Sequence, residues 1–156
     1  MKMSALGRQA LIEMEGSQVA AYRDSAGLLT IGVGHLLTKS ELSSGKLAIA
    51  GQTVKWRDSL TAGQVDALLA QDIAPVETAV TAAVKVPVTE DQFDALVCFA
   101  FNVGSGAFRG SNLLRKLNSG NYAAVPTQMR RWVYAGGEVV AGLANRRERE
   151  IAMWSA

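Results

Sequence analysis

The hydrophobic pattern predicts a first helix that begins after Ser4 and ends before Gly16. Serine is a favoured helix N-cap, and glycine commonly follows the last helical turn. The apolar residues fall on one stripe at helical spacing: Leu6, Ala10, Leu11 and Met14. Glu15 is therefore expected at the end of a helix.

Two longer helices are predicted in the middle of the chain, each opened by a capping box. Thr61-x-x-Gln64 begins a helix over about residues 61–84, in which Pro75 is expected to cause a kink or a break. Thr89-x-x-Gln92 begins a second helix that ends near Gly104. Its apolar side predicts the core helix of the fold.

Between the first and second helices the pattern changes to that of a small sheet. Residues 20–35 are rich in Gly, Thr and branched side chains, and residues 25–27 offer a turn between two short strands. Thr38-x-x-Glu41 predicts a short helix, followed by a Gly- and Ser-rich loop and a strand near residues 52–56. Shorter helices are expected after the core helix, at about 112–118, 122–133 and 144–154.

Composition agrees with a folded α+β protein that is mostly α. The 156 residues are 49% hydrophobic and 19% charged, which provides a core and excludes a disordered chain. This length suits a single domain.

The formal net charge of +2 conceals an uneven distribution. Residues 101–156 hold eight Arg or Lys against three Glu, a net charge of +5 for this part. Such a surface favours an anionic polymer, either nucleic acid, membrane or bacterial wall, although solvated helix faces are an equally ordinary explanation. The chain has no zinc-finger, helix-turn-helix or RNP-like motif, so no nucleic-acid partner is expected.

The single cysteine, Cys98, lies in an apolar run and is expected to be buried. One cysteine allows no intramolecular disulfide, so a reducing compartment of synthesis is acceptable. With one His and one Cys far apart, the chain offers no convincing zinc set, and neither a metal nor an organic cofactor is expected. Polar residues interrupt the N-terminal segment before a signal peptide or membrane span can form, which predicts no stable membrane insertion.

The candidate chemistry lies between Glu15 and His35. Glycosidic-bond cleavage needs a proton donor and a second carboxylate across the sugar, and Glu15 and Asp24 could face one space. By themselves the two residues are ordinary surface residues. However, three glycines follow within this segment, and Thr30 could project a hydroxyl that holds a water with Asp24.

This segment reads E-x8-D-x-x-G-x-x-T-x-G-x-G-H and resembles the catalytic signature of the phage lysozymes related to that of phage T4, glycoside hydrolase family 24. The resemblance continues at 101–108, 113–117, 130–132 and 145–148, covers about residues 5–154, and is closer to the endolysins of lambdoid-like phages. It implies one lysozyme-like catalytic domain over 1–156 with a two-lobed fold. The expected parts are a β-containing lobe (about 15–60), a connecting helix (about 61–84) and a helical lobe (85–156) against which the N-terminal helix packs.

The resemblance also implies the roles of individual residues. Glu15 would be the general acid, Asp24 the second carboxylate, and Thr30 would help to position the nucleophilic water. Arg146 matches a family arginine that pairs with the catalytic glutamate.

Supporting roles are implied for three further residues. Phe101 and Asn102 resemble positions that line the sugar cleft, although Phe101 suits an ordinary core equally well. By spacing, His35 is expected to order the hairpin through a carboxylate contact more than to transfer protons.

The resulting hypothesis is an endolysin that hydrolyses the β-1,4 bond between N-acetylmuramic acid and N-acetylglucosamine in peptidoglycan, with inversion, for host cell lysis. A lytic transglycosylase and a non-catalytic module that binds cell-wall glycan are the alternatives. The expected enzyme is a monomer that stays in the host cytoplasm until a holin permeabilises the membrane, and then acts on the wall in the periplasm.

Overall fold

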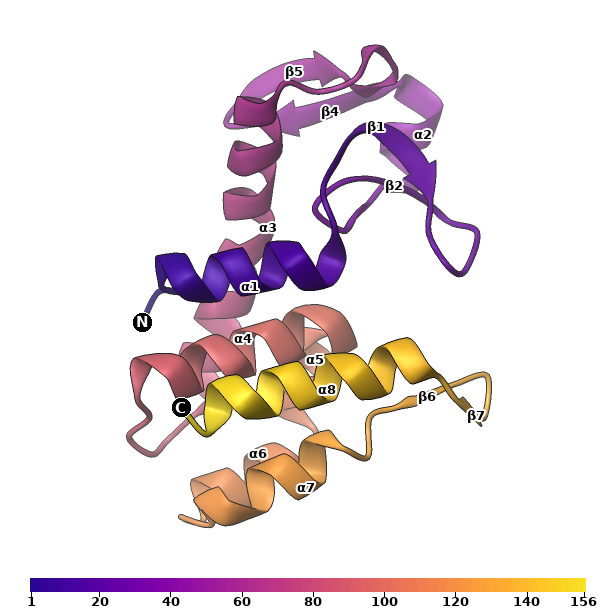
Figure 1. Ribbon diagram of the computed structural model, residues 1–156. Helices are drawn as coiled ribbons and strands as arrows, with labels where there is room; N and C mark the ends of the chain where they lie inside the picture. The colour runs from indigo at the N-terminus through magenta and orange to yellow at the C-terminus, as the bar shows by residue number, and fades with distance from the viewer. The chain divides into compact units, whose positions relative to one another are not determined.

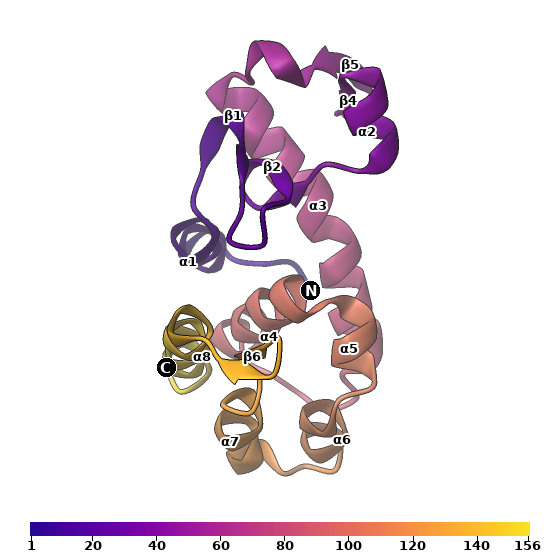
Figure 2. The ribbon, with the colours of Figure 1, turned by 90° about the vertical axis from the view of Figure 1, so that its right-hand side faces the viewer.

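In the computed structural model, which describes residues 1–156, helix α4 (Glu90–Val103) has the most continuous burial. Residues 93–100 are all buried, including Cys98 as expected. The predicted capping box is present, since the Thr89 side chain accepts from the Gln92 N–H and the Gln92 side chain accepts from the Thr89 N–H. Helix α8 (Ala141–Trp154) packs along α4, as Figures 1 and 2 show.

The unit built around α4 comprises residues 1–9 and 75–156. Its other elements are α5 (Ser105–Arg109), α6 (Asn112–Asn118), a 3-10 turn η2 (Tyr122–Ala124), α7 (Val125–Met129) and the short strands β6 (Tyr134–Ala135) and β7 (Glu138–Val139). The prediction for α6 is confirmed. The helix expected over 122–133 is wrong over its last four residues, because α7 ends at Met129. Helix α8 begins before the expected residue 144.

Helix α1 (Ala5–Glu15) is tied to α4 through its N-cap. The Ser4 hydroxyl accepts from the Gly7 N–H at 2.9 Å and donates to the buried Asp94 carboxylate. The Ser4 N–H donates to the same carboxylate at 3.0 Å. The predicted stripe is wrong at Leu6, which is 81% exposed, because Gly7 occupies the face that meets Asp94.

The second unit, residues 10–74, contains the small sheets. Strands β1 (Gln18–Arg23), β2 (Leu29–Gly32) and β3 (His35–Leu36) form an antiparallel sheet in that order. The capping box of α2 (Lys39–Ser44) is present as predicted, and β4 (Lys46–Ile49) pairs with β5 (Gln52–Lys55) ahead of the turn η1 (Trp56–Asp58). The predicted loop thus contains a strand, whose Leu47 and Ile49 are buried.

Helix α3 (Ala62–Ala83) supplies residues to both units and continues through Pro75. A break at this proline, one of the two expected outcomes, is therefore wrong. Proline removes one donor from the helix, while Ile73 and Val80 on either side are fully buried and hold their turns in place. No helix of the fold combines the length and apolarity needed to cross a bilayer.

Candidate active site

Asp24 begins the tight loop between β1 and β2. Its Oδ1 accepts from the Ala26 and Leu28 N–H groups, both at 2.9 Å, and its own N–H donates to the Leu28 carbonyl at 2.9 Å. Short acidic side chains favour such turns because they bind the backbone a few residues ahead. Oδ1 is therefore occupied by the loop, and Oδ2 stays available to a ligand.

Thr30 lies on β2 and is buried, with 4% of its surface exposed. Its hydroxyl donates to the Leu28 carbonyl at 3.0 Å, so its oxygen lone pairs can accept a further bond. Leu28 thus anchors both polar residues, Asp24 through its N–H and Thr30 through its carbonyl. The backbone of Leu28 therefore binds both side chains of the pair.

Tyr22 faces Thr30 directly across the β1–β2 ladder. Burial and, after it, the negative charges of Glu15 and Asp24 raise the pKa of the Tyr22 phenol above its ordinary value. Both carboxylates therefore act on one phenol, which stays protonated at neutral pH. The sequence motif pointed to no role for Tyr22, although Tyr22 and Asp24 are two positions apart and a strand places such residues on one face.

Glu15 is the last residue of α1 and lies against Gly34 in the β2–β3 turn. Gly34 has a φ of +66°, and a Cβ at this position would lie 2.6 Å from Glu15 Oε2. Only glycine combines this backbone conformation with so close an approach. The glycine therefore leaves the space that the carboxylate occupies.

His35 contacts two carboxylates. Nδ1 lies 2.7 Å from Asp72 Oδ2 on α3, and Nε2 lies 3.0 Å from Glu41 Oε1 on α2. Burial lowers the pKa of His35, but the hydrogen bonds and charges of the two carboxylates outweigh it and raise the pKa to about 9. His35 therefore joins β3, α2 and α3 as an imidazolium.

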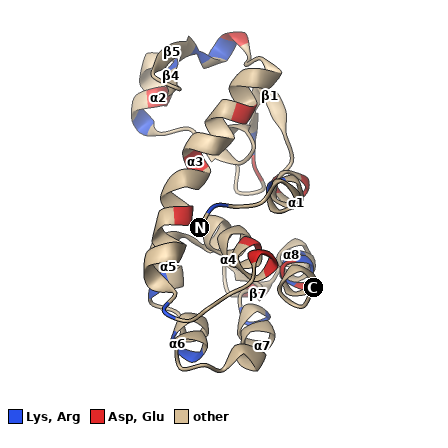
Figure 3. Ribbon diagram, turned by 90° about the vertical axis from the view of Figure 1, so that its left-hand side faces the viewer, with Lys and Arg blue, Asp and Glu red and all other residues tan.

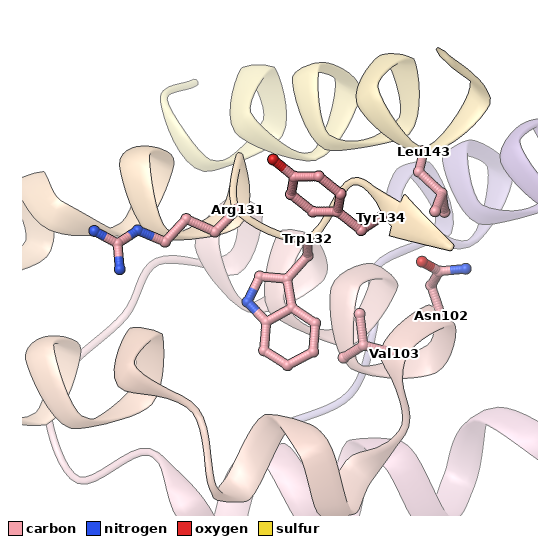
Figure 4. A pocket seen from close by; sticks show the side chains of 6 residues that line it. All are labelled: Asn102, Val103, Arg131, Trp132, Tyr134 and Leu143. Carbon is pink, nitrogen blue, oxygen red and sulfur yellow. The ribbon is translucent and has the colours of Figure 1, made fainter. Parts of the chain in front are cut away.

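Asn102 belongs to the unit built around α4, where it lines a pocket of about 330 Å³. The pocket is formed by six side chains, shown in Figure 4: Asn102, Val103, Arg131, Trp132, Tyr134 and Leu143. Trp132 is half-buried, and Tyr134 is 62% exposed. Phe101, beside Asn102 on α4, is half-buried.

Arg146 is buried on α8, where its Nε lies 3.1 Å from Glu150 Oε1 and its Nη2 donates to the Cys98 carbonyl at 3.0 Å. The pairing of Arg146 with Glu15, implied by the resemblance, stays a prediction.

The basic C-terminal part of the sequence is not a continuous basic surface. Arg146 and Arg147 are buried, and Arg130 pairs with Glu148 at 2.7 Å. Figure 3 shows acidic and basic residues together along α8. The net charge of +5 therefore overstates the field that the exposed arginines of this part can produce.

In this mostly helical protein, two carboxylates act on the Tyr22 phenol at a small sheet, and Thr30 pairs with Tyr22 across the ladder. No group of three or more His, Cys, Asp or Glu side chains is placed to hold a metal ion. A pair of carboxylates beside an anchored hydroxyl is the equipment of a glycoside hydrolase.

Comparison with known proteins gives the same class. A sequence model described as phage lysozyme matches residues 12–150. The chain is 42% identical to the SAR-endolysin of Escherichia phage Mu, over 95% of this chain and 78% of that protein. A solved structure of a mutant P22 lysozyme matches with a TM-score of 0.81 and 36% identity, covering 100% of this chain and 99% of that one.

A third similarity is to the muramidase domain of SpmX from Asticaccaulis excentricus, with a TM-score of 0.79 and 33% identity over 99% of this chain and 98% of that one. The chain belongs to the phage lysozyme family. It is a glycoside hydrolase of the lysozyme type that acts on the bacterial cell wall. The family, the mostly α fold with a small sheet, and the enzyme class predicted from the sequence are confirmed.

Proposed function

We propose that the enzyme hydrolyses the β-1,4 bond between N-acetylmuramic acid and N-acetylglucosamine, with Glu15 as general acid and with Asp24 and Thr30 holding the attacking water. The observation that carries this proposal is the shared anchor at Leu28, whose N–H binds Asp24 and whose carbonyl binds Thr30. It ties both side chains to one residue and leaves Asp24 Oδ2 and the lone pairs of Thr30 Oγ1 as acceptors.

A water bound by two acceptors gives each of them a hydrogen and keeps its lone pairs for the anomeric carbon. As the water oxygen bonds to that carbon, the glycosidic bond breaks and its oxygen takes the proton of Glu15. Asp24 takes a proton from the water, so charge and atoms balance. Attack from the face opposite the leaving group inverts the anomeric centre.

The substitution Glu15→Gln tests the acid. It keeps the shape of the side chain and removes its proton, and should lower the release of soluble fragments from purified sacculi by at least about a hundredfold. Retention of a tenth of the wild-type rate would rule Glu15 out as the acid. A thermal melt of the variant checks that the fold is intact.

Mass spectrometry of the products separates hydrolysis from transglycosylation. Free reducing N-acetylmuramic acid supports hydrolysis, and 1,6-anhydro ends would support the lytic transglycosylase alternative. The Asp24 and Thr30 pair favours hydrolysis, because internal attack by a substrate hydroxyl needs no held water. An α-anomer as the first product, observed by NMR, would support inversion.

Phe101 and Asn102 are proposed to bind the sugar, and His35 to support the hairpin that carries the glycines. Arg146 is proposed to pair with Glu15. The half-buried position of Phe101 and the place of Asn102 at the pocket support the assignment of these two residues to the sugar.

We further propose that the enzyme is a monomer that accumulates in the host cytoplasm and reaches the periplasm through a separate holin-type pore. Cys98 supports this route, because it is a buried free thiol and folding needs no oxidising compartment. Expression without a pore should leave cells intact until chloroform is added. Lysis without permeabilisation would contradict the proposal.

A further inference from the structure

Helix α8 carries a buried ion pair, Arg147–Glu150, whose glutamate also contacts Arg146. The proposed hydrolysis assigns no role to Arg147. Arg147 and Glu150 are both 0% exposed, and Arg147 Nε lies 3.0 Å from Glu150 Oε2. Burying two charges costs several kcal/mol per ion, roughly, and an apolar pair of similar size is often at least as stable. The pair therefore calls for a reason other than stability.

Arg147 contacts Asn102, which lines the pocket in Figure 4, and Phe99, which packs against the lining residue Trp132. Its Nη2 donates to Asn102 Oδ1, and its guanidinium lies 5.0 Å from the centre of the Phe99 ring. Phe99 in turn meets the Trp132 ring edge-on at 5.5 Å. One buried side chain thus contacts Asn102 directly and supports Trp132 through Phe99.

The contact with Arg147 fixes the direction of the Asn102 amide. A guanidinium can only donate hydrogen bonds, so the amide oxygen must face Arg147 and the amide nitrogen must turn away. The orientation follows from this chemistry and not from the choice between O and N at the amide. Asn102 therefore offers the pocket two N–H donors and no acceptor.

We propose that the buried Arg147–Glu150 pair is a positioning device that locks Asn102 as a donor, and so makes the pocket select a ligand with a carbonyl acceptor. The ligand class is an N-acetylated sugar: its acetamido oxygen accepts from Asn102, and its ring packs on Trp132 and Tyr134. This inference rests on the proposed action on peptidoglycan. It assigns roles to Arg147 and Glu150, which touch no substrate themselves.

The substitution Asn102→Asp tests the lock with little change of shape. A carboxylate still accepts from Arg147, but its second oxygen replaces the two donors by an acceptor. We expect a melting temperature close to that of the wild type and at least a tenfold loss of affinity for chitotetraose. Cellotetraose has a hydroxyl in place of each acetamido group, so its affinity should change much less.

NMR gives a direct readout of the same contact. The side-chain NH2 signals that disappear in Asn102→Asp should shift when chitotetraose is added to the wild type, and should not shift with cellotetraose. Equal affinity of Asn102→Asp and wild type for chitotetraose would overturn the proposal. The proposal would also be overturned if the wild type hydrolyses sacculi but its Asn102 NH2 signals do not shift when chitotetraose is added.

The substitution Arg147→Lys tests the positioning residue. Lysine keeps a charge for Glu150 but has no fork that can bind Glu150 and Asn102 together. We expect KM for sacculi to rise several-fold with kcat little changed, while Arg115→Lys, an exposed change on α6, alters neither. If Arg147→Lys does not fold, the Asn102 experiments decide. A wild type that releases no fragments from sacculi would instead refute the proposed function.

Discussion

At the scale of single residues, Gly34 has two constraints that can be separated. Its positive φ disfavours any side chain, and its lack of a Cβ leaves room for Glu15. Gly51 shares the first constraint alone, because it has a φ of +77° and a Cβ added there would meet no heavy atom within 4 Å. The two glycines form a matched pair.

Gly34→Ala should therefore reduce lytic activity at least tenfold, because the new methyl group displaces the Glu15 carboxylate. Gly51→Ala should cost a similar stability, about 1 kcal/mol, with activity retained. Sacculus hydrolysis and urea unfolding measure the two effects. Equal activities of the two variants would show that the position of the carboxylate against residue 34 is unimportant.

Strand pairing places Tyr22 at the site, opposite Thr30. Its phenol stays protonated beside two carboxylates and can donate to a substrate hydroxyl. Tyr22→Phe should lower kcat/KM by about three- to tenfold, the worth of one neutral hydrogen bond, with little change in melting temperature. An unchanged kcat/KM would remove Tyr22 from the site.

At the scale of elements, the His35 cluster makes the stability of the sheet-containing unit depend on pH. The folded pKa of about 9 exceeds the ordinary 6.5, so the folded state holds a proton that the unfolded chain releases between these values. The contribution, about 3 kcal/mol from the size of this shift, is complete below pH 6.5 and is lost as the pH rises through 9.

Urea unfolding between pH 6 and pH 10 should show this decline in the wild type. Asp72→Asn should flatten the curve, because it removes one of the two carboxylates that hold the proton. A wild-type stability that is constant over this interval would contradict the assignment. At low pH the sign reverses: the bonds from Thr38 and His35 outweigh burial and lower the pKa of Glu41, so its contribution is lost on acidification.

The elements that the sequence predicted correctly are those specified by local chemistry. The capping boxes at Thr38, Thr61 and Thr89 depend on residues three positions apart, and all three are present. By contrast, α5 and the β6–β7 hairpin are only a few residues long and carry no sustained period, so the sequence pattern predicts neither element. A break was one expected outcome at Pro75 because helix propensity alone does not include the burial of Ile73 and Val80 on either side of it.

The site residues also fall into those that local sequence specifies and those that only the fold brings together. The candidates from Glu15 to His35 share one continuous motif, so a sequence pattern could find them. Tyr22 required the register of β1, which contains a bulge after Gln18 that the sequence does not announce. Arg147 stood in a charged run that resembles a solvated surface, and Glu150 three residues later was the one signal of a buried pair.

At the scale of the whole molecule, the ion pairs of the exposed arginines decide how the enzyme responds to salt. Arg130 and Arg131 are adjacent and exposed, but Arg130 is paired with Glu148, and Arg131 lines the pocket. Replacing Arg131 by Gln should therefore weaken the salt dependence of binding to sacculi more than replacing Arg130 by Gln. Binding measured between 50 and 300 mM salt, on the order of the range where the Debye length halves, checks this. Equal slopes for both variants would contradict it.

At Leu28 the backbone and the side chain have separate roles, so the side chain can be replaced while the backbone bonds are kept. Leu28 bonds to Asp24 and Thr30 through its backbone atoms alone, while its side chain is 49% exposed and takes no part in either bond. A fluorophore attached at this position would lie on the peptide whose N–H and carbonyl hold the two side chains. Residue 28 is thus a natural place for an optical reporter of events at the loop, read in real time on an enzyme whose chemistry is otherwise intact.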